Sequence, residues 1–294
     1  MTWPTKTPGK RRGLALLIAA AAAVATGTSA TAATNTAAAT KTTATTQTTA
    51  ATKKYPEVST LLVAGASDLR PAFEKLGRRF TATTGTKVTF SFGSSGQLAR
   101  QIINGAPFDV FASADVGFVD RVLAAGIGDR TTKSTYAFGR LALWTPPGSP
   151  QLSSVSELGD ASIKRIAIAN PDHAPYGIAA VQTLTSARIY DSVKNRLVYG
   201  ENVSDAYRLG TSGNADAALV SLSVVLADAK GGRYLIVPTE GHRPLQQALV
   251  VTATAPRSPS AKAFAALVRS KDGRSVMRKF GFLLPGDTMP SGNA

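Results

Sequence analysis

Short apolar runs alternate with amphipathic segments along the chain from about residue 55 onward. Several runs have the continuous or every-second-residue apolar pattern of a strand, and each is followed by apolar residues at helical spacing. In the first part of the chain, these strands and helices are predicted at 58–64, 71–83, 85–92, 97–104, 108–112 and 117–125. Strands that alternate with helices are typical of a mostly parallel sheet flanked by helices, which is an α/β fold.

The same alternation repeats in the second half. The predicted strands are 137–145, 163–169, 196–199, 234–237 and 245–254, with an apolar run at 217–222 and helices at 154–158, 178–187, 223–229, 260–269 and 272–280 and after Asn202. The last strand and its helices have only the first unit left to pair with. We therefore expect two lobes between which the chain crosses twice. Lobe I takes 57–140 and 247–286, lobe II takes 141–246, and 287–294 forms a flexible tail.

The first 54 residues lack the pattern of a globular domain. Lys10-Arg11-Arg12 is followed by an apolar stretch at 14–24 that is too short to span a bilayer, and Ala30-Thr31-Ala32 resembles a cleavage site. These features predict a secretory signal peptide over 1–32 and a secreted, periplasmic protein. The Thr/Ala-rich stretch 33–54 cannot build an apolar core and is expected to be a disordered tether.

Composition narrows the function. The formal charge of the 294 residues is +15, but residues 1–54 hold seven of the 33 basic residues and no acidic one. The remainder carries 26 basic and 18 acidic residues, which are scattered without a basic stripe, so we expect no nucleic-acid partner. The chain has no cysteine and two histidines, which argues against a disulfide, a lipid-anchor cysteine, a cofactor or a zinc site.

Two stretches have the composition of an anion site. Gly93-Ser94-Ser95-Gly96 separates a strand-like run from a helix, and Gly65-Ala66-Ser67-Asp68 does the same near the start of the folded region. The first N–H groups of a helix have no partner within the helix, glycine allows close approach to the backbone, and serine adds a donor without charge. Because open α/β sheets bind ligands at the carboxyl ends of their strands, both stretches are expected to face one cleft.

At these positions the sequence resembles the periplasmic molybdate-binding proteins of ABC importers. The similarity spans about 58–282, with four motifs in the family's order. The motifs are Ala64-Gly65-Ala66-Ser67-Asp68-Leu69, the segment 91–102, the segment 105–115, and Asn170-Pro171-Asp172-His173-Ala174-Pro175-Tyr176-Gly177. The resemblance implies the type II periplasmic binding protein fold, with one tetrahedral oxyanion, molybdate or tungstate, held between the lobes of a non-enzymatic monomer that serves an ABC permease.

The resemblance also implies the ligand donors. Ser67 and Ser95 give their hydroxyls and backbone N–H groups, and Tyr176 and Val203 give backbone N–H groups. Some family members add a tyrosine hydroxyl at the position of Ser221, where the shorter serine either reaches the ligand through altered packing or leaves it one donor fewer.

A site made only of donors suits molybdate, tungstate and sulfate, which are fully deprotonated at neutral pH. Phosphate usually keeps a proton, needs an acceptor, and should be rejected. Asp68 is expected to point away from the ligand and to cap the helix that follows.

Three other functions stay open at this point. The first is a receptor for another small anion, such as sulfate or a carboxylate. The second is a hydrolase with Ser67 or Ser95 as the nucleophile, although the sequence supplies no complete set of catalytic partners and His173 is expected to be structural. The third is an interaction module that the tether displays at the cell surface.

Overall fold

The computed structural model describes residues 60–149, 152–228, 231–253 and 257–288. The predicted signal peptide, the predicted tether and most of the predicted tail lie outside these residues. The described part contains two five-stranded sheets with helices packed on them. We call the first sheet and its helices lobe I, and the second sheet and its helices lobe II.

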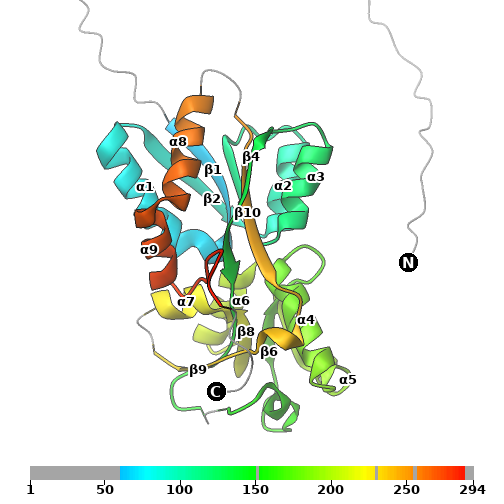
Figure 1. Cartoon of the computed structure of the whole chain (residues 1–294). Coiled ribbons are helices and arrows are strands. Elements are labelled where there is room, and N and C mark those ends of the chain that lie inside the picture. Colours follow the sequence, from blue (N-terminus) through cyan, green and yellow to red (C-terminus); the bar gives the residue numbers. More distant parts are fainter. Residues whose placement is uncertain (1–59, 150–151, 229–230, 254–256, 289–294) are drawn as a thin grey trace, which may run out of the picture. The chain divides into compact units, whose positions relative to one another are not determined.

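The sheet of lobe I has the strand order β2-β1-β3-β10-β4 (Figure 1). Its strands are β1 (Thr60–Ala66), β2 (Lys87–Gly93), β3 (Val110–Ser113), β4 (Asp129–Gly139) and β10 (Leu245–Val251). β10 is antiparallel to both of its neighbours, β3 and β4, so the other four strands share one direction. β1, β3 and most of β10 are buried, as their uninterrupted apolar sequences predict.

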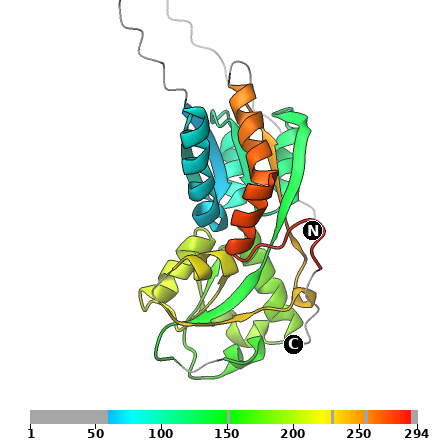
Figure 2. The ribbon, with the colours of Figure 1, turned by 60° about the vertical axis from the view of Figure 1, so that its left-hand side comes forward.

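Helices cover both faces of this sheet. α1 (Arg70–Thr84), α8 (Ser258–Arg269) and α9 (Lys271–Lys279) lie on one face, and α2 (Ser95–Ile103) and α3 (Val116–Ala124) on the other (Figures 1 and 2). Phe73 and Phe80 of α1 pack edge-on against Phe264 of α8, with ring centroids 5.9 and 5.5 Å apart. Such aromatic pairs contribute about 0.5–1.5 kcal/mol each beyond their burial.

The sheet of lobe II has the order β7-β6-β8-β5-β9. Its strands are β5 (Leu141–Thr145), β6 (Ile166–Ala169), β7 (Leu197–Gly200), β8 (Ala217–Ser221) and β9 (Arg233–Ile236). Here β5 is the reversed strand. The α-helices of this lobe are α4 (Pro175–Ser186), α5 (Tyr190–Val193), α6 (Val203–Thr211) and α7 (Leu222–Ala227). Trp144 of β5 is buried against Tyr207 of α6, with ring centroids 5.1 Å apart.

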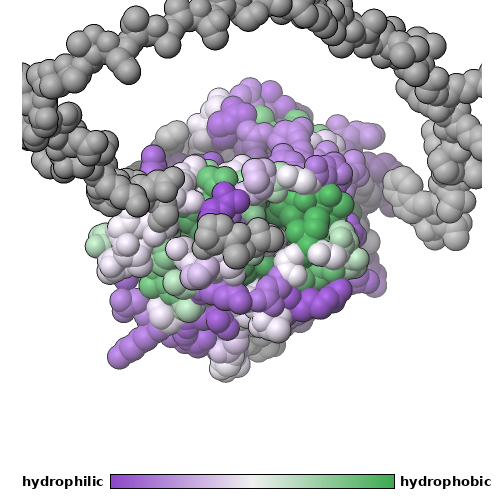
Figure 3. Space-filling model, turned by 90° about the horizontal axis from the view of Figure 1, so that it is seen from above, coloured by the Kyte–Doolittle hydropathy of each residue, from purple (hydrophilic) through white to green (hydrophobic). Residues whose placement is uncertain are grey.

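Four short 3-10 segments complete the described secondary structure. They are η1 (Ser67–Leu69), η2 (Val155–Gly159), η3 (Lys194–Arg196) and η4 (Thr239–Gly241). Across the described residues, we find no helix with the length and apolar character that a membrane span requires. Seen from above, hydrophilic side chains dominate the visible surface and border a smaller apolar area (Figure 3).

The chain passes from the first sheet to the second between β4 and β5 and returns between β9 and β10. The single strand predicted at 137–145 is in fact two strands, β4 and β5, which belong to different sheets and are separated only by Arg140. The apolar pattern continues past Arg140, so it shows no break between the two strands, although the predicted lobes divide at 140/141. β4 begins at Asp129, well before the predicted start. The prediction missed this part because residues 129–135 are largely polar and partly exposed at the edge of the sheet, so they lack an apolar strand pattern.

Candidate anion site

Four of the five predicted ligand residues line one small cavity. They are Ser67 and Ser95 from lobe I and Tyr176 and Val203 from lobe II. The complete lining is Ala66, Ser67, Asp68, Gly93, Ser94, Ser95, Ala114, Ala174, Pro175, Tyr176 and Val203. The cavity volume is about 10 Å³, close to the minimum that holds one ordered water.

The topology explains why these residues meet. Ser67 follows β1 and Ser95 follows β2, while Tyr176 and Val203 begin the helices that come after β6 and β7. These four strands are parallel within their sheets, so all four residues lie beyond carboxyl ends, where open α/β sheets bind ligands.

The two serine hydroxyls are left free to donate. Ser95 Oγ accepts a hydrogen bond from the backbone N–H of Ala114 at 3.0 Å, and Ser67 Oγ accepts one from the N–H of Ser204 at 3.3 Å. Each oxygen is therefore held in place as an acceptor, while its own hydrogen has no acceptor among the described residues. Both serines are at least 97% buried. Because buried polar hydrogens normally find an acceptor, these two hydroxyls are suited to an anionic ligand.

Two backbone donors come from lobe II. Tyr176 lies in the first turn of α4 and Val203 is the first residue of α6, and neither N–H has an acceptor within the part of the chain that the structure describes. Asn202 caps α6 by accepting from the N–H of Asp205 at 3.1 Å, so its side chain leaves the Val203 N–H free. Helix N-termini of this kind carry a partial positive charge that favours anions.

Contacts between the lobes enclose the cavity. Gly96 N–H donates to the carbonyl oxygen of His173 at 2.9 Å, and Ser94 Oγ lies 2.7 Å from His173 Nδ1. Nearer the surface, Gln97 Nε2 donates to Glu201 Oε2 at 2.8 Å. The two lobes are therefore closed on each other around the site.

The position of Asp68 shows that one prediction is wrong, namely that this residue points away from the ligand and caps the following helix. Its side chain neither caps α1 nor faces solvent: the residue is fully buried and lines the cavity. Its Oδ2 accepts hydrogen bonds from the Tyr176 hydroxyl at 3.1 Å and from Gln247 Nε2. Burial raises the pKa of the carboxyl from 3.8 to about 6, although these hydrogen bonds and the backbone N–H groups of Asp68 and Leu69 partly oppose the shift. The site thus includes an acceptor, and the expectation that phosphate is rejected for lack of one is wrong.

The structure does not bring Ser221, the fifth predicted residue, to the cavity. Its Oγ accepts from the N–H of Val224 at 3.4 Å and so caps α7, and it lies 3.0 Å from Ser223 Oγ. Ser223 in turn donates to the backbone oxygen of Asp68 at 2.7 Å. Ser221 is therefore engaged with its own helix α7, and its neighbour Ser223 joins α7 to lobe I.

The contacts of His173 do not favour a hydrolase. A serine nucleophile needs a general base within hydrogen-bond reach, and His173 Nδ1 contacts Ser94 instead of Ser67 or Ser95. Ser94 is itself occupied as the cap of α2, where its Oγ accepts from the N–H of Gln97 at 3.4 Å. His173 Nε2 lies 3.8 Å from Glu201. These contacts give His173 a structural place between the lobes.

Gln247 and Tyr136 support the site through Asp68, and neither was predicted from the sequence. Both are buried, and the Tyr136 hydroxyl lies 3.0 Å from Gln247 Oε1 and 3.2 Å from the backbone oxygen of Ser113. One signal was available in the sequence: Gln247 directly precedes the apolar run 248–251 of β10. In the structure it is fully buried. A buried amide requires polar partners, here Asp68 and Tyr136.

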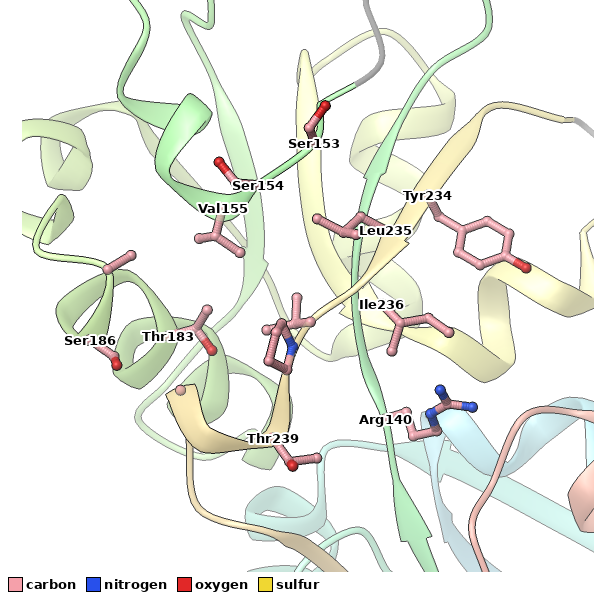
Figure 4. A pocket seen from close by; sticks show the side chains of 14 residues that line it. Arg140, Ser153, Ser154, Val155, Thr183, Ser186, Tyr234, Leu235, Ile236 and Thr239 are labelled. Carbon is pink, nitrogen blue, oxygen red and sulfur yellow. The ribbon is translucent and has the colours of Figure 1, made fainter. Parts of the chain in front are cut away.

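A larger groove of about 750 Å³ lies elsewhere on lobe II (Figure 4). Tyr234, Leu235 and Ile236 of β9 line it together with Thr183 and Arg140. It contains none of the predicted ligand residues. Within the described ranges, no group of three or more His, Cys, Asp or Glu side chains could hold a metal ion.

Comparisons with known proteins show the family of this chain. The family model described as bacterial extracellular solute-binding protein matches residues 61–283. The molybdate-binding protein ModA of Rhodobacter capsulatus is 31% identical over 76% of this chain and 88% of its own length. The molybdate-binding protein ModA of Azotobacter vinelandii is 32% identical over 77% of this chain and 90% of its own length.

Solved structures place the fold in the same group. The periplasmic molybdate-binding protein of Azotobacter vinelandii superposes with a TM-score of 0.72 at 31% identity, over 76% of this chain and 99% of that one. The sulfate-binding protein SubI of Mycobacterium tuberculosis superposes with a TM-score of 0.68 at 16% identity, over 76% and 86% of the two chains, which shows the fold alone. The fold is thus that of type II periplasmic binding proteins, and the relatives are binding proteins, not enzymes. The chain belongs to the bacterial extracellular solute-binding protein family.

Proposed function

We propose that this protein binds molybdate, and tungstate in the same way, outside the cytoplasm and delivers it to the permease of an ABC importer. The observation that carries the proposal is the convergence of uncharged donors from both lobes, at Ser67, Ser95, Tyr176 and Val203, on one cavity. The similarity to molybdate-binding proteins of two bacteria supports the choice of anion.

Apart from the Asp68 carboxyl, the polar side chains of the lining are hydroxyls, which suit a fully deprotonated oxyanion. No Lys or Arg lines the cavity, so the charge of the ligand is met by hydroxyl and backbone donors that are already in position. Pre-positioned donors need no reorganisation when the anion arrives. Because sulfate carries the same charge, selection between molybdate and sulfate must come from the size of the cavity.

We expect Ser95→Ala to weaken molybdate binding by on the order of 1–3 kcal/mol, since a donor to a charged acceptor is lost. This corresponds to roughly 5- to 150-fold in Kd. Calorimetric titration of the ligand-free protein with molybdate, tungstate, sulfate and phosphate measures the effect and ranks the anions.

Ser212→Ala is the matched control, because Ser212 is an exposed serine at the far end of α6. Its affinity should equal that of the parent. Equal affinity of Ser95→Ala and the parent would remove Ser95 from the ligand set. A parent protein that binds none of the four anions would overturn the proposed function.

A further inference from the structure

The carboxyl group of Asp68 has one satisfied and one unsatisfied oxygen. Oδ2 accepts from Tyr176 and Gln247, whereas Oδ1 is buried and makes no hydrogen bond of normal geometry within the described chain. The residue lines the cavity into which the proposed ligand donors converge. A buried carboxylate oxygen without a donor is unfavourable, and a buried carboxylic acid with no acceptor is also incomplete. Either form of this side chain calls for a partner in the cavity.

The surroundings of Asp68 provide no positive charge. The titratable groups that face it are the Tyr176 hydroxyl from α4 and the Tyr136 hydroxyl from β4, and burial raises the pKa of both phenols, so they stay neutral. β10 and α7 contribute Gln247 and Ser223, which do not titrate. No described Lys, Arg or His forms an ion pair with Asp68, so no positive charge offsets the repulsion that a bound dianion would exert on its ionised form.

The hydrogen-bond directions determine where a proton would reside. Gln247 Oε1 accepts from Tyr136, so Gln247 Nε2 donates to Asp68, and the Tyr176 hydroxyl donates to the same oxygen. A proton on Oδ2 would point toward two groups that already donate hydrogen bonds to this oxygen, which is unfavourable. The proton would therefore sit on Oδ1, the oxygen that has no protein partner.

We propose that Asp68 takes up a proton from solvent when the anion enters the cavity, and that its Oδ1–H then acts as a further ligand donor. The only bond formed is the O–H bond on Oδ1, and the only species consumed are the anion and one proton. This inference rests on the proposed function. It adds that a proton accompanies each dianion, and that the neutral form of Asp68 restores a site made of donors, which disfavours hydrogenphosphate.

The closed arrangement of the lobes permits this linkage. Burial within it raises the pKa of Asp68 to about 6, so the carboxyl is mostly ionised near neutral pH. A dianion in the same cavity disfavours the ionised form further and raises the pKa again. Binding should therefore become weaker as pH rises above 6, by up to about tenfold per pH unit when one proton is linked, until the pKa of the complex is passed.

Calorimetry of the full-length secreted protein with sodium molybdate tests the linkage. Titrations at pH 7.5 in buffers of low and high ionisation enthalpy give the number of protons taken up. We expect a value approaching one for the parent and near zero for Asp68→Asn, whose amide can donate without titrating. The Kd of the parent should rise between pH 6.5 and 8.5, whereas that of Asp68→Asn should stay constant. Asp120→Asn, at an exposed site on α3, is the matched control and should take up protons like the parent.

The outcomes separate the two proposals. Molybdate binding by the parent without proton uptake overturns the role of Asp68 and leaves the proposed function standing. Undiminished uptake by Asp68→Asn also overturns it and assigns the proton to another group. Absence of binding to the parent overturns both proposals. If Asp68→Asn fails to fold, Asp68→Ser takes its place in the same titrations, and a parent that takes up no proton still overturns the role of Asp68.

Discussion

Gly96→Ala is expected to weaken binding of the anion by roughly 10- to 1,500-fold while both lobes stay folded. A Cβ atom at position 96 would lie 2.7 Å from the carbonyl oxygen of His173 and 2.9 Å from a ring carbon of Phe118. The carbonyl belongs to lobe II, so the clash opposes closure, and the hydrogen bond from Gly96 N–H to the same oxygen would be strained. Overpacking costs about 1–3 kcal/mol and a lost hydrogen bond about 0.5–1.5 kcal/mol, which together give this range at about 1.4 kcal/mol per tenfold.

Titration with molybdate and thermal unfolding of the ligand-free variant check this prediction together. Gly159→Ala is the matched control, because its Cβ would meet only Ile189, at the ordinary distance of 3.7 Å. Parent-like affinity of Gly96→Ala would show that the bound state does not require this contact between the lobes. A large fall in the melting temperature would instead mean that the clash disrupts lobe I.

The substitution Asp68→Asn is expected to stabilise the ligand-free protein more at pH 7.5 than at pH 4. The stability difference between variant and parent should change by on the order of 3 kcal/mol between these pH values. The folded-state pKa is about 6 against 3.8 for the free side chain, and each unit corresponds to about 1.4 kcal/mol. Because the folded state holds the proton more tightly, the parent loses this stability as pH rises from about 4 through 6. Asparagine does not titrate and should escape the loss.

Urea unfolding of the two proteins at pH 4 and pH 7.5, without ligand, measures the difference. The quantity to compare is the change in their stability difference between the two pH values, because this cancels any constant effect of the amide on the hydrogen bonds. A stability difference that is the same at both pH values would contradict a buried carboxyl with a raised pKa.

Much of the fold could be predicted because its information is local. The uninterrupted apolar run at 58–64 and the helical spacing of Phe73, Leu76 and Phe80 correspond to β1 and α1 within a few residues. Ser67 and Ser95 could be singled out for the same reason. Glycine and serine at the junction between a strand and a helix predict an anion site without information from distant parts of the sequence.

The surroundings of Asp68 could not be predicted in this way. Its partners Tyr176 and Gln247 are 108 and 179 residues away in the sequence, so only the closed arrangement of the two lobes brings them together. Locally, an aspartate before Leu69 and Arg70 has the appearance of a helix cap, which is a common role for that residue. The contacts of Ser221 were hidden likewise, because a serine at a helix start gives no sign of whether its hydroxyl faces a ligand or the helix.

The shared strand order of the two sheets has a consequence for the shape of the solute. β6 and β7 occupy in lobe II the places that β1 and β2 occupy in lobe I, so Ser67 corresponds to Tyr176 and Ser95 to Val203. The proposed donors thus form two equivalent pairs, one from each lobe. A tetrahedral anion can offer one edge of two oxygens to each lobe. A flat carboxylate has only one such edge and would satisfy one half of the site while leaving the other unfilled.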